Sequence, residues 1–274
     1  GLVGFAVIRY RHRREPGEPP QRFGSKRLET LWTAIPILIV SALFAVTVRI
    51  MAEVDAPRAP GGAPDVIITG HRWWWEARYP NGAVAAGEIH IPAGKRLLAE
   101  IASADVIHDF WAPQLARKMD AVPGKPGYIW LEADKPGSYQ GACAEFCGKQ
   151  HAWMRFAVIA QPEAEFSAWV QRQSQPAAVP ASGPAAEGAR LFQEKKCGQC
   201  HAIAGTQATG TSGPPLTHVA SRQTLGSGIS PNNPQNMALW INVPQSVKPG
   251  NLMPDSHLSE QETQALLAYM ESLE

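Results

Sequence analysis

The four cysteines of this 274-residue chain fall into two close pairs, and further metal-ligating side chains stand beside each pair. Cys143 and Cys147 form the first pair, and Cys197 and Cys200 form the second. No cysteine is left to link distant segments, so cofactors explain the sulfur better than a disulfide framework does. Two metal centres in a chain without an obvious substrate-binding motif predict electron transfer.

The first pair belongs to a short segment that also contains His151 and Met154. Thiolates are soft ligands and a thioether is a weak axial donor, a combination suited to copper that cycles between two oxidation states. His108, in the segment Val-Ile-His-Asp-Phe-Trp, is the natural distant ligand to complete the set. A zinc site, a reduced thiol pair and a disulfide remain as alternatives. Spacing favours copper, because zinc sites more often separate their cysteines by two residues and need no methionine.

The second pair reads Cys197-Gly-Gln-Cys200-His201, which is the attachment signature of c-type haem. The two thiols add to the haem vinyl groups, and the adjacent histidine is thereby placed under the iron as an axial ligand. A thioredoxin-like redox pair is the alternative, but it does not predict the immediate histidine. Met253, in Lys-Pro-Gly-Asn-Leu-Met-Pro, is the best candidate for the sixth ligand, because methionine raises the potential of the haem.

A membrane span must precede these centres, because residues 31–48 contain no charge and are long enough to cross a bilayer core. A buried core helix is the alternative. Positive side chains precede the span and acidic ones follow it, which places the chain from about residue 52 onward outside the cytoplasm. These residues are Arg9, Arg11, Arg13, Arg14, Arg22, Lys26 and Arg27 before the span, and Glu53 and Asp55 after it. We interpret the apolar residues 1–8 as the end of a first transmembrane helix, which predicts a helical hairpin.

The outer region divides into two parts of different composition. From about residue 61 to 160, short runs with partial alternation, punctuated by proline and glycine, predict an antiparallel β-sandwich or barrel. A short helix is expected over residues 163–173, and further helices over 185–196, 234–242 and 259–273. The predicted organisation is a transmembrane region (1–58, second helix 29–52), a β-domain (59–172), a proline-rich linker (173–185) and an all-α domain (186–274). A net charge of +1 argues against a nucleic-acid partner.

The motifs resemble those of subunit II of cytochrome c oxidase. The segment Cys-Ala-Glu-Phe-Cys-Gly-Lys-Gln-His-Ala-Trp-Met resembles the loop that binds binuclear copper (CuA) in that family. The segments His-Asp-Phe-Trp-Ala-Pro, Lys-Met-Asp-Ala-Val-Pro-Gly-Lys, Gly-His-Arg-Trp-Trp-Trp-Glu and Leu-Glu-Thr-Leu-Trp-Thr-Ala-Ile-Pro match too, in the expected order. The similarity covers roughly residues 1–172 and implies a cupredoxin-like β-domain. The last domain resembles class I cytochromes c, so the whole is similar to the caa-type arrangement.

The resemblance implies a ligand set for the two coppers. Cys143 and Cys147 would each bridge both metals, with His108 and His151 as terminal ligands. Met154 would bind one copper, and the backbone carbonyl of Glu145 the other. The side chain of Glu145 could also reach a magnesium ion shared with subunit I.

The resemblance also implies roles for residues that are not copper ligands. On a strand, Trp73 and Trp75 would share a face, and packing alone could explain the indoles. The resemblance makes Trp73 the point at which electrons enter the copper site. Glu29 could be a solvated helix-terminal carboxylate, but the resemblance makes it a proton-uptake residue for subunit I. Lys118 and Asp120 are expected to lie against subunit I.

The resemblance implies the electron-accepting subunit of a bacterial, proton-pumping oxidase. Electrons would arrive at haem c, pass to CuA and reach the haem of subunit I, where oxygen is reduced to water. The chain would be a multi-pass protein of the bacterial inner (cell) membrane, with both metal domains on the periplasmic face. Its partners would be subunits I and III and a donor such as cytochrome c or a quinol–cytochrome c reductase complex. A nitrous oxide reductase would need a large preceding catalytic domain, and a copper chaperone would need neither the methionine nor a covalent haem.

Overall fold

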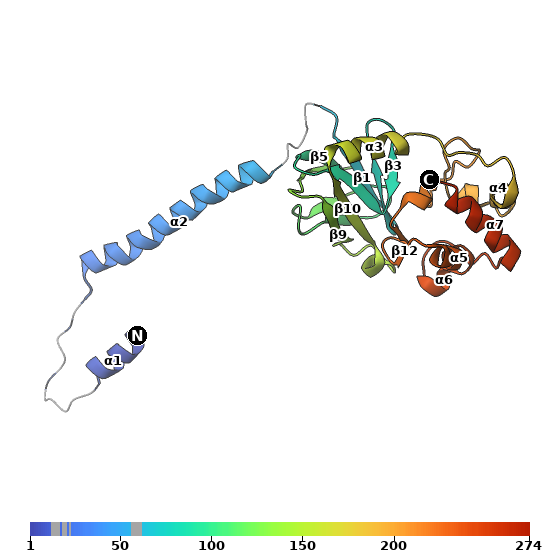
Figure 1. The fold of residues 1–274 in the computed structure, drawn as a ribbon. Coiled ribbons are helices and arrows are strands. Elements are labelled where there is room, and N and C mark those ends of the chain that lie inside the picture. The colour runs from blue at the N-terminus through green and yellow to red at the C-terminus, as the bar shows by residue number, and fades with distance from the viewer. Residues whose placement is uncertain (12–16, 18–20, 22, 56–61) are drawn as a thin grey trace. The chain divides into compact units, whose positions relative to one another are not determined.

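The structure is a computed structural model that describes residues 1–11, 17, 21, 23–55 and 62–274 (Figure 1). Three of the charges used for orientation, Arg13, Arg14 and Arg22, lie outside the described residues, as does the predicted boundary between residues 58 and 59. The chain divides into two compact units, Gly1–Val54 and Asp55–Glu274.

The first unit consists of two helices, α1 (Leu2–Arg9) and α2 (Lys26–Val54). Helix α2 contains the predicted span, and its mean hydropathy of 2.3 over an 18-residue window makes it a candidate membrane helix. Pro36 lies inside it, and its apolar side chains are exposed, as a lipid-facing helix requires. At 8 residues, the described part of α1 is too short to cross a bilayer, so the predicted hairpin stays a prediction.

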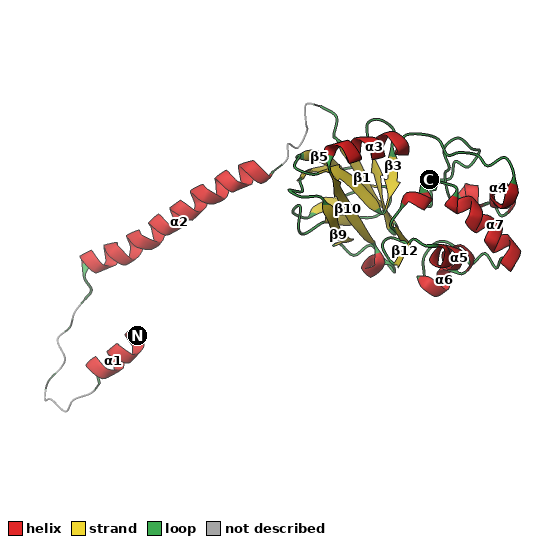
Figure 2. Ribbon diagram, viewed as in Figure 1, coloured by secondary structure: helices red, strands yellow, loops and turns green. Residues whose placement is uncertain are grey.

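The first half of the second unit is built from two five-stranded sheets (Figure 2). The first has the strand order β3-β2-β1-β5-β8 and the second β4-β10-β9-β6-β7. The bounds of the first sheet are Val84–Ala86, Trp74–Arg78, Val66–His71, Leu97–Ser103 and Gly127–Leu131, in that order. Those of the second are Glu88–Pro92, Arg155–Gln161, Gly137–Cys143, His108–Trp111 and Met119–Ala121.

The predicted β-sandwich class is confirmed, with one refinement. Most neighbours are antiparallel, but β1 pairs with β5, and β4 with β10, in parallel. The aromatic centre of the core is formed by Trp75, Phe110 and Phe156, which meet at ring-centroid distances of 4.5 to 5.6 Å. These three rings lie in the core beneath β6, which begins at His108, and β9, which ends at Cys143.

The tryptophan block does not form one strand, so the prediction that Trp73 and Trp75 share a strand face is wrong. Strand β1 ends at His71 and β2 begins at Trp74, which leaves Trp73 in the turn between them. Trp75 is fully buried in the core, whereas Trp74 stacks on His71 with centroids 4.2 Å apart. Strand propensity alone could not show that the chain reverses here.

The second half of the unit is mainly helical, as predicted for the last domain. Helix α3 (Glu163–Gln173) packs on the β-core through Trp169, whose ring lies 3.8 Å from that of His90. The remaining elements are α4 (Gly183–Glu194), η2 (Cys197–Gln199), η3 (Val219–Ser221), β11 (Thr224–Leu225), β12 (Ser230–Pro231), α5 (Pro234–Asn242), α6 (Pro244–Val247) and α7 (Glu260–Glu271).

Helices α4 and α7 cross closely and form the second core. A side chain at Gly188 would overlap the backbone of Ala265, so glycine is required at the crossing. Phe192 of α4 meets Tyr269 of α7 edge to face, with centroids 5.8 Å apart. Ser259 caps α7 in a capping box with Glu262. This core supports the Cys-x-x-Cys-His segment directly after α4.

Candidate metal centres

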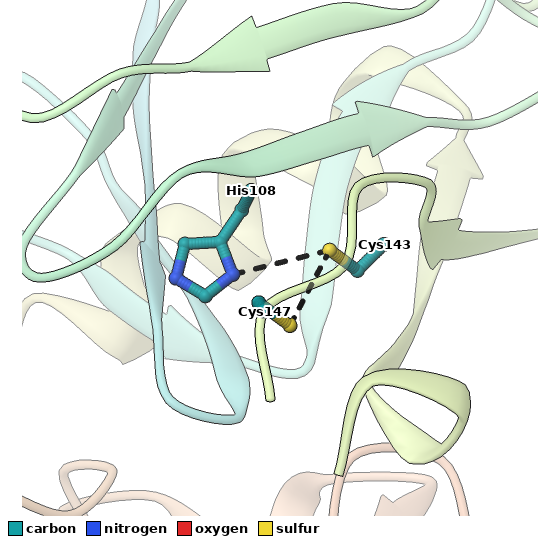
Figure 3. Close-up of side chains that lie close together, drawn as sticks. All are labelled: His108, Cys143 and Cys147. Atoms are coloured by element: carbon teal, nitrogen blue, oxygen red, sulfur yellow. Dashed lines mark hydrogen bonds between the residues drawn. The ribbon is translucent and has the colours of Figure 1, made fainter. Parts of the chain in front are cut away.

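Three of the predicted copper ligands meet at the end of the second sheet. Cys143 is the last residue of β9, and β9 pairs with β6, which begins at His108. His108 Nδ1 lies 3.9 Å from Cys143 Sγ, and the two cysteine sulfurs are 3.8 Å apart (Figure 3). All three side chains are buried, and their ligand atoms lie within 4.8 Å of one another. Strand pairing therefore brings together residues that are far apart in the sequence.

The other predicted donors surround the same two sulfurs. Cys147 Sγ lies 3.7 Å from His151 Nδ1 and 3.7 Å from Met154 Sδ. Cys143 Sγ lies 3.2 Å from the backbone oxygen of Glu145. Met154 is fully buried, which places its thioether in the site and not in solvent. All six donors predicted from the sequence thus converge on the thiol pair.

The chemistry of the donors fits copper. Both cysteines are free thiols, and their separation of 3.8 Å is far beyond an S–S bond of about 2.05 Å. A structural zinc site is complete with four nitrogen or sulfur ligands and has no use for a buried thioether. Two thiolates, two imidazoles and a thioether on a rigid β-scaffold are what a copper electron-transfer centre uses.

Asp105 orients His108, and the sequence reasoning missed it. Its Oδ1 lies 2.8 Å from His108 Nε2, which directs the Nδ1 atom at the sulfurs. The backbone N–H groups of Arg72 and Val106 donate to the same carboxylate. Partial burial acts to raise the pKa of Asp105, but hydrogen bonds from His108, Val106 and Arg72 outweigh it and lower the pKa. The only sequence signal was an acidic residue shortly before the histidine.

The thiol pair is electrostatically prepared to bind a cation. The hydrogen bond with Cys147, aided by His108, lowers the pKa of the Cys143 thiol despite its burial. The same contact raises the pKa of Cys147. The pair therefore favours a thiolate on Cys143, and thiolate is the form that binds soft metals.

Trp73 lies directly against the copper loop. Its indole Nε1–H donates to the carbonyl oxygen of Cys147 at 2.8 Å. Gly148, with φ of +113°, makes this approach possible, since a Cβ there would lie 3.1 Å from Trp73 Cζ2. This contact places Trp73 beside the predicted metal ligands, and its role in electron transfer stays a prediction.

The second centre is organised around His201. Cys197 starts η2, and the backbone N–H of His201 donates to the carbonyl of Cys197 at 3.0 Å. His201 Nδ1 lies 2.7 Å from the carbonyl oxygen of Pro214, so it must donate, which leaves Nε2 free to bind iron. Burial lowers the pKa of His201 and keeps the imidazole neutral. Gly213 lacks a Cβ that would stand 2.5 Å from the His201 ring.

The other residues with roles predicted from the sequence lie elsewhere in the structure, and their contacts do not decide those roles. Met253 lies in the loop before α7, where its N–H donates to Asn251 Oδ1 and its carbonyl accepts from Gln245. The described hydrogen bonds fix its backbone, so its sulfur remains a predicted haem ligand. Glu29 lies in the first turn of α2, in the other unit. Lys118 Nζ is 6.0 Å from the ring centroid of Trp111, and Asp120 is paired with β6.

Comparison with known proteins gives matches to both halves of the second unit. Residues 83–161 match the family model of the cytochrome c oxidase subunit II periplasmic domain, and residues 185–274 match that of cytochrome c. Cytochrome c oxidase subunit 2 of Alkalihalophilus pseudofirmus is 39% identical over 98% of this chain and 80% of its own length. The corresponding protein of Bacillus sp. (strain PS3) is 32% identical over 95% of this chain and 79% of its own.

Among solved structures, the periplasmic domain of subunit II of cytochrome oxidase of Bradyrhizobium japonicum is similar. It is 30% identical, with a TM-score of 0.39, and the match covers 42% of this chain and 95% of that chain.

Proposed function

The chain belongs to the cytochrome c oxidase subunit II family and carries a C-terminal cytochrome c domain, and from this premise we propose an electron route through it. Electrons are accepted at a covalently bound haem c, pass to a binuclear CuA centre and continue to the haem of subunit I. Oxygen is reduced to water there, coupled to proton pumping. The observation that carries the proposal is the convergence of two imidazoles, a thioether and a backbone carbonyl oxygen on one buried thiol pair.

The copper ligands have distinct tasks in this proposal. Cys143 and Cys147 would hold the two coppers together, and the centre, when loaded, would supply one-electron transfer with little change in bond length. His108 and His151 are the terminal ligands, and Asp105 keeps the first of them in one tautomer and orientation. Met154 and the carbonyl oxygen of Glu145 complete the set. Strands β6 and β9 position His108 and Cys143, and the loop between β9 and β10 supplies the other donors.

The haem ligands are supplied by the helical half. Cys197 and Cys200 attach the haem covalently, and His201 and Met253 bind its iron. The hydrogen bond from His201 Nδ1 to Pro214 orients the imidazole and increases its basicity. Methionine as the second ligand favours a high potential, as an acceptor at the start of a respiratory route needs.

The outer residues connect this route to partners. Trp73, which touches the Cys147 carbonyl, is the proposed point at which electrons enter the copper site. The Glu145 side chain contributes to a magnesium site shared with subunit I, and Glu29 takes up protons for subunit I. Helix α2 anchors the chain in the bacterial inner (cell) membrane, and α1 is proposed to belong to a further membrane helix, which would make the chain multi-pass. Both metal domains face the periplasm, subunits I and III are neighbours, and cytochrome c or a quinol–cytochrome c reductase complex is the donor.

A rapid reduction experiment tests the route. The full chain is matured with haem c and copper in detergent, and a reductant pulse supplies less than one electron per haem. We expect the haem to be reduced first and then reoxidised, while the near-infrared band of the copper centre bleaches at the same rate. In Cys147→Ser the haem should stay reduced. A haem that stays reduced in the copper-loaded wild type would contradict the proposal.

A further inference from the structure

One lysine of the cytochrome c domain is buried against the copper loop. Lys248, directly after α6, is only 3% exposed. Its Nζ donates to the carbonyl oxygen of Trp153 at 3.1 Å and to that of Gly226 at 3.0 Å. Trp153 ends η1 (His151–Trp153) and precedes Met154, so it belongs to the segment that supplies two predicted copper ligands. Gly226 belongs to the cytochrome c domain, and the ammonium therefore joins the two domains.

The burial of this ammonium needs an explanation. Lysine is almost never fully buried without a partner of opposite charge, and the desolvation of an ion costs several kcal/mol. The described hydrogen bonds of Lys248 Nζ go to neutral carbonyls. Burial lowers the pKa of Lys248 to about 8, and the nearby sulfur of Cys147 acts in the opposite direction and supports the charged form. An apolar residue would pack here at lower cost, whereas the ammonium with its directed hydrogen bonds fixes one relative position of two segments.

Further contacts near Lys248 join the cytochrome c domain to the β-domain. The hydroxyl of Ser227 donates to the carbonyl oxygen of Trp73 at 2.8 Å, and the side-chain amide of Gln150 donates to the carbonyl of Pro249. Gly228 has a φ of +79°, and a Cβ there would stand 3.3 Å from the Cβ of Arg155. The cytochrome c domain thus touches both segments that frame the copper site, the Trp73 turn and η1.

A buried carboxylate of the β-domain makes a second contact with the cytochrome c domain, away from the copper loop. Glu88 of β4 is 4% exposed, and its Oε1 accepts the backbone N–H groups of Gln223 at 2.7 Å and of Thr224 at 3.1 Å. These two amides belong to the cytochrome c domain and donate across the domain boundary. Their hydrogen bonds exist only while the domains are in contact, so their exchange with solvent reports the contact directly.

The segment predicted as a free linker is itself held. The N–H of Ala177 donates to the carbonyl of Ala204 at 3.0 Å, and Ala177 is buried in the helical core. The carbonyl of Gln175 lies 3.0 Å from His218 Nε2. Part of the connection between the domains therefore packs on the cytochrome c domain, which shortens the length of chain free to swing.

We propose that Lys248 is a positioning residue that fixes the cytochrome c domain in one register on the η1 turn beside the copper ligands. The cytochrome c domain is then docked on the β-domain that carries the copper site, and it does not move freely on its linker. The role of this docking in electron transfer rests on the proposed function. The docking itself does not, because it can be measured without any electron moving.

Hydrogen–deuterium exchange on the full chain, loaded with haem and copper, tests the docking. We expect the amides of Gln223 and Thr224 to be protected in the wild type. In Lys248→Met they should exchange about tenfold faster or more, while the amides of α4 and α7 keep their protection. Lys135→Met removes the charge of an exposed lysine on the copper domain and should change nothing. Lys248→Gln, which keeps an N–H donor without the charge, should give an intermediate rate and serves if Lys248→Met does not fold.

Unprotected amides in the wild type, or equal exchange in wild type and folded Lys248 variants, would overturn the proposal. The reductant-pulse experiment gives the second readout. Haem-to-copper transfer in Lys248→Met should slow about tenfold or more and become sensitive to solvent viscosity, as expected for a domain that must first find its site. An unchanged transfer rate would also overturn the positioning role. Protected amides that lose protection in Lys248→Met, with no transfer in the wild type, would contradict the proposed function and leave the docking standing.

Discussion

At the scale of single residues, the copper site depends on atoms just outside its ligand set. Asp105 accepts three hydrogen bonds and directs His108 Nδ1 toward the sulfurs, so the imidazole is held before metal arrives. Partners of this kind set the tautomer and the basicity of a ligating histidine. The contribution of His108 to copper binding should therefore be inseparable from that of Asp105.

Asp105→Asn should lower the copper affinity without unfolding the β-domain. The amide keeps one oxygen acceptor but loses the charge that supports the imidazole, and losses of this type are about 10- to 100-fold in metal affinity. Competition with a copper chelator measures the effect. Asp134→Asn, at an exposed aspartate of the same domain, is the control. Equal affinities in the two variants would show that Asp105 does not support the ligand.

Trp73 and Trp74 offer a matched pair of substitutions. Trp73→Phe removes the N–H bond to the Cys147 carbonyl and should slow electron transfer to copper about tenfold or more, with copper retained. Trp74→Phe alters an indole that stacks on His71 and should leave the rate near that of the wild type. The reductant pulse gives both rates. If Trp74→Phe were the slower variant, the electron path would not pass through Trp73.

The predicted copper ligands could be recognised in the sequence because four of the five side chains fall within one loop, and only His108 is distant. It could not find Asp105 or Lys248. Their partners are brought to them by strand pairing and domain contact, which leave no pattern in the local sequence. A buried lysine looks the same in a sequence as an exposed one, and only its neighbours distinguish the two.

At the scale of elements, strand β9 connects the hydrophobic core to the metal site. Gly141 stands opposite Phe156 of β10, and a side chain at this position would overlap the phenyl ring. Phe156 is 1% exposed and stacks on Phe110, so it has little freedom to move. The position of Cys143, at the end of the same strand, depends on this close approach.

Gly141→Ala should destabilise the β-domain by about 1–3 kcal/mol, the usual cost of overpacking a filled core. Gly137→Ala is the control on the same strand, because its Cβ would meet Tyr139 only at an ordinary 3.6 Å. Chemical unfolding followed by tryptophan fluorescence measures both. Comparable stability losses in the two variants would mean that the Phe156 contact is not the cause.

Helix α7 has an electrostatic cap whose contribution depends on pH. Hydrogen bonds with Lys195 and Ser259 lower the pKa of Glu262 from 4.5 to about 2. The ionised carboxylate is therefore favoured in the folded state. Its contribution to the free energy of unfolding is complete above pH 4.5 and is lost as the pH falls toward 2. Glu262→Gln should lower Tm by a few degrees at neutral pH and low salt, with the difference vanishing near pH 2.

Thermal unfolding monitored at the haem Soret band gives this comparison. Glu260→Gln, at an exposed acid of the same turn, should show no such pH-dependent difference. A Tm difference for Glu262→Gln that persists at pH 2 would argue against the ionised cap.

Elements with a clear period could be predicted closely. The helices over residues 163–173 and 234–242 begin and end where expected. The parallel strand pairs and the turn at Trp73 could not, because pairing direction and chain reversal depend on distant partners. Trp-Trp-Trp has high strand propensity at each position, and tertiary structure overrides it at the first.

At the scale of the whole molecule, one chain joins a membrane helix, a copper domain and a haem domain. A flexible tether alone would give an effective concentration of roughly millimolar between the two metal domains. The contacts of Lys248, Ser227 and Glu88 do more than keep the two metal domains close, since they select one relative arrangement of the two. Transfer within the docked pair would then be independent of diffusion and of salt.

Metal analysis combined with EPR of the oxidised full chain, matured with haem c, tests the central claim most directly. We predict two coppers per haem, with one unpaired electron shared equally between two coppers, beside the signal of a low-spin haem. The Cys147→Ser chain should lose the shared signal and keep the haem. A single isolated copper, or zinc in its place, would contradict the account, because no binuclear centre could then pass the electron on.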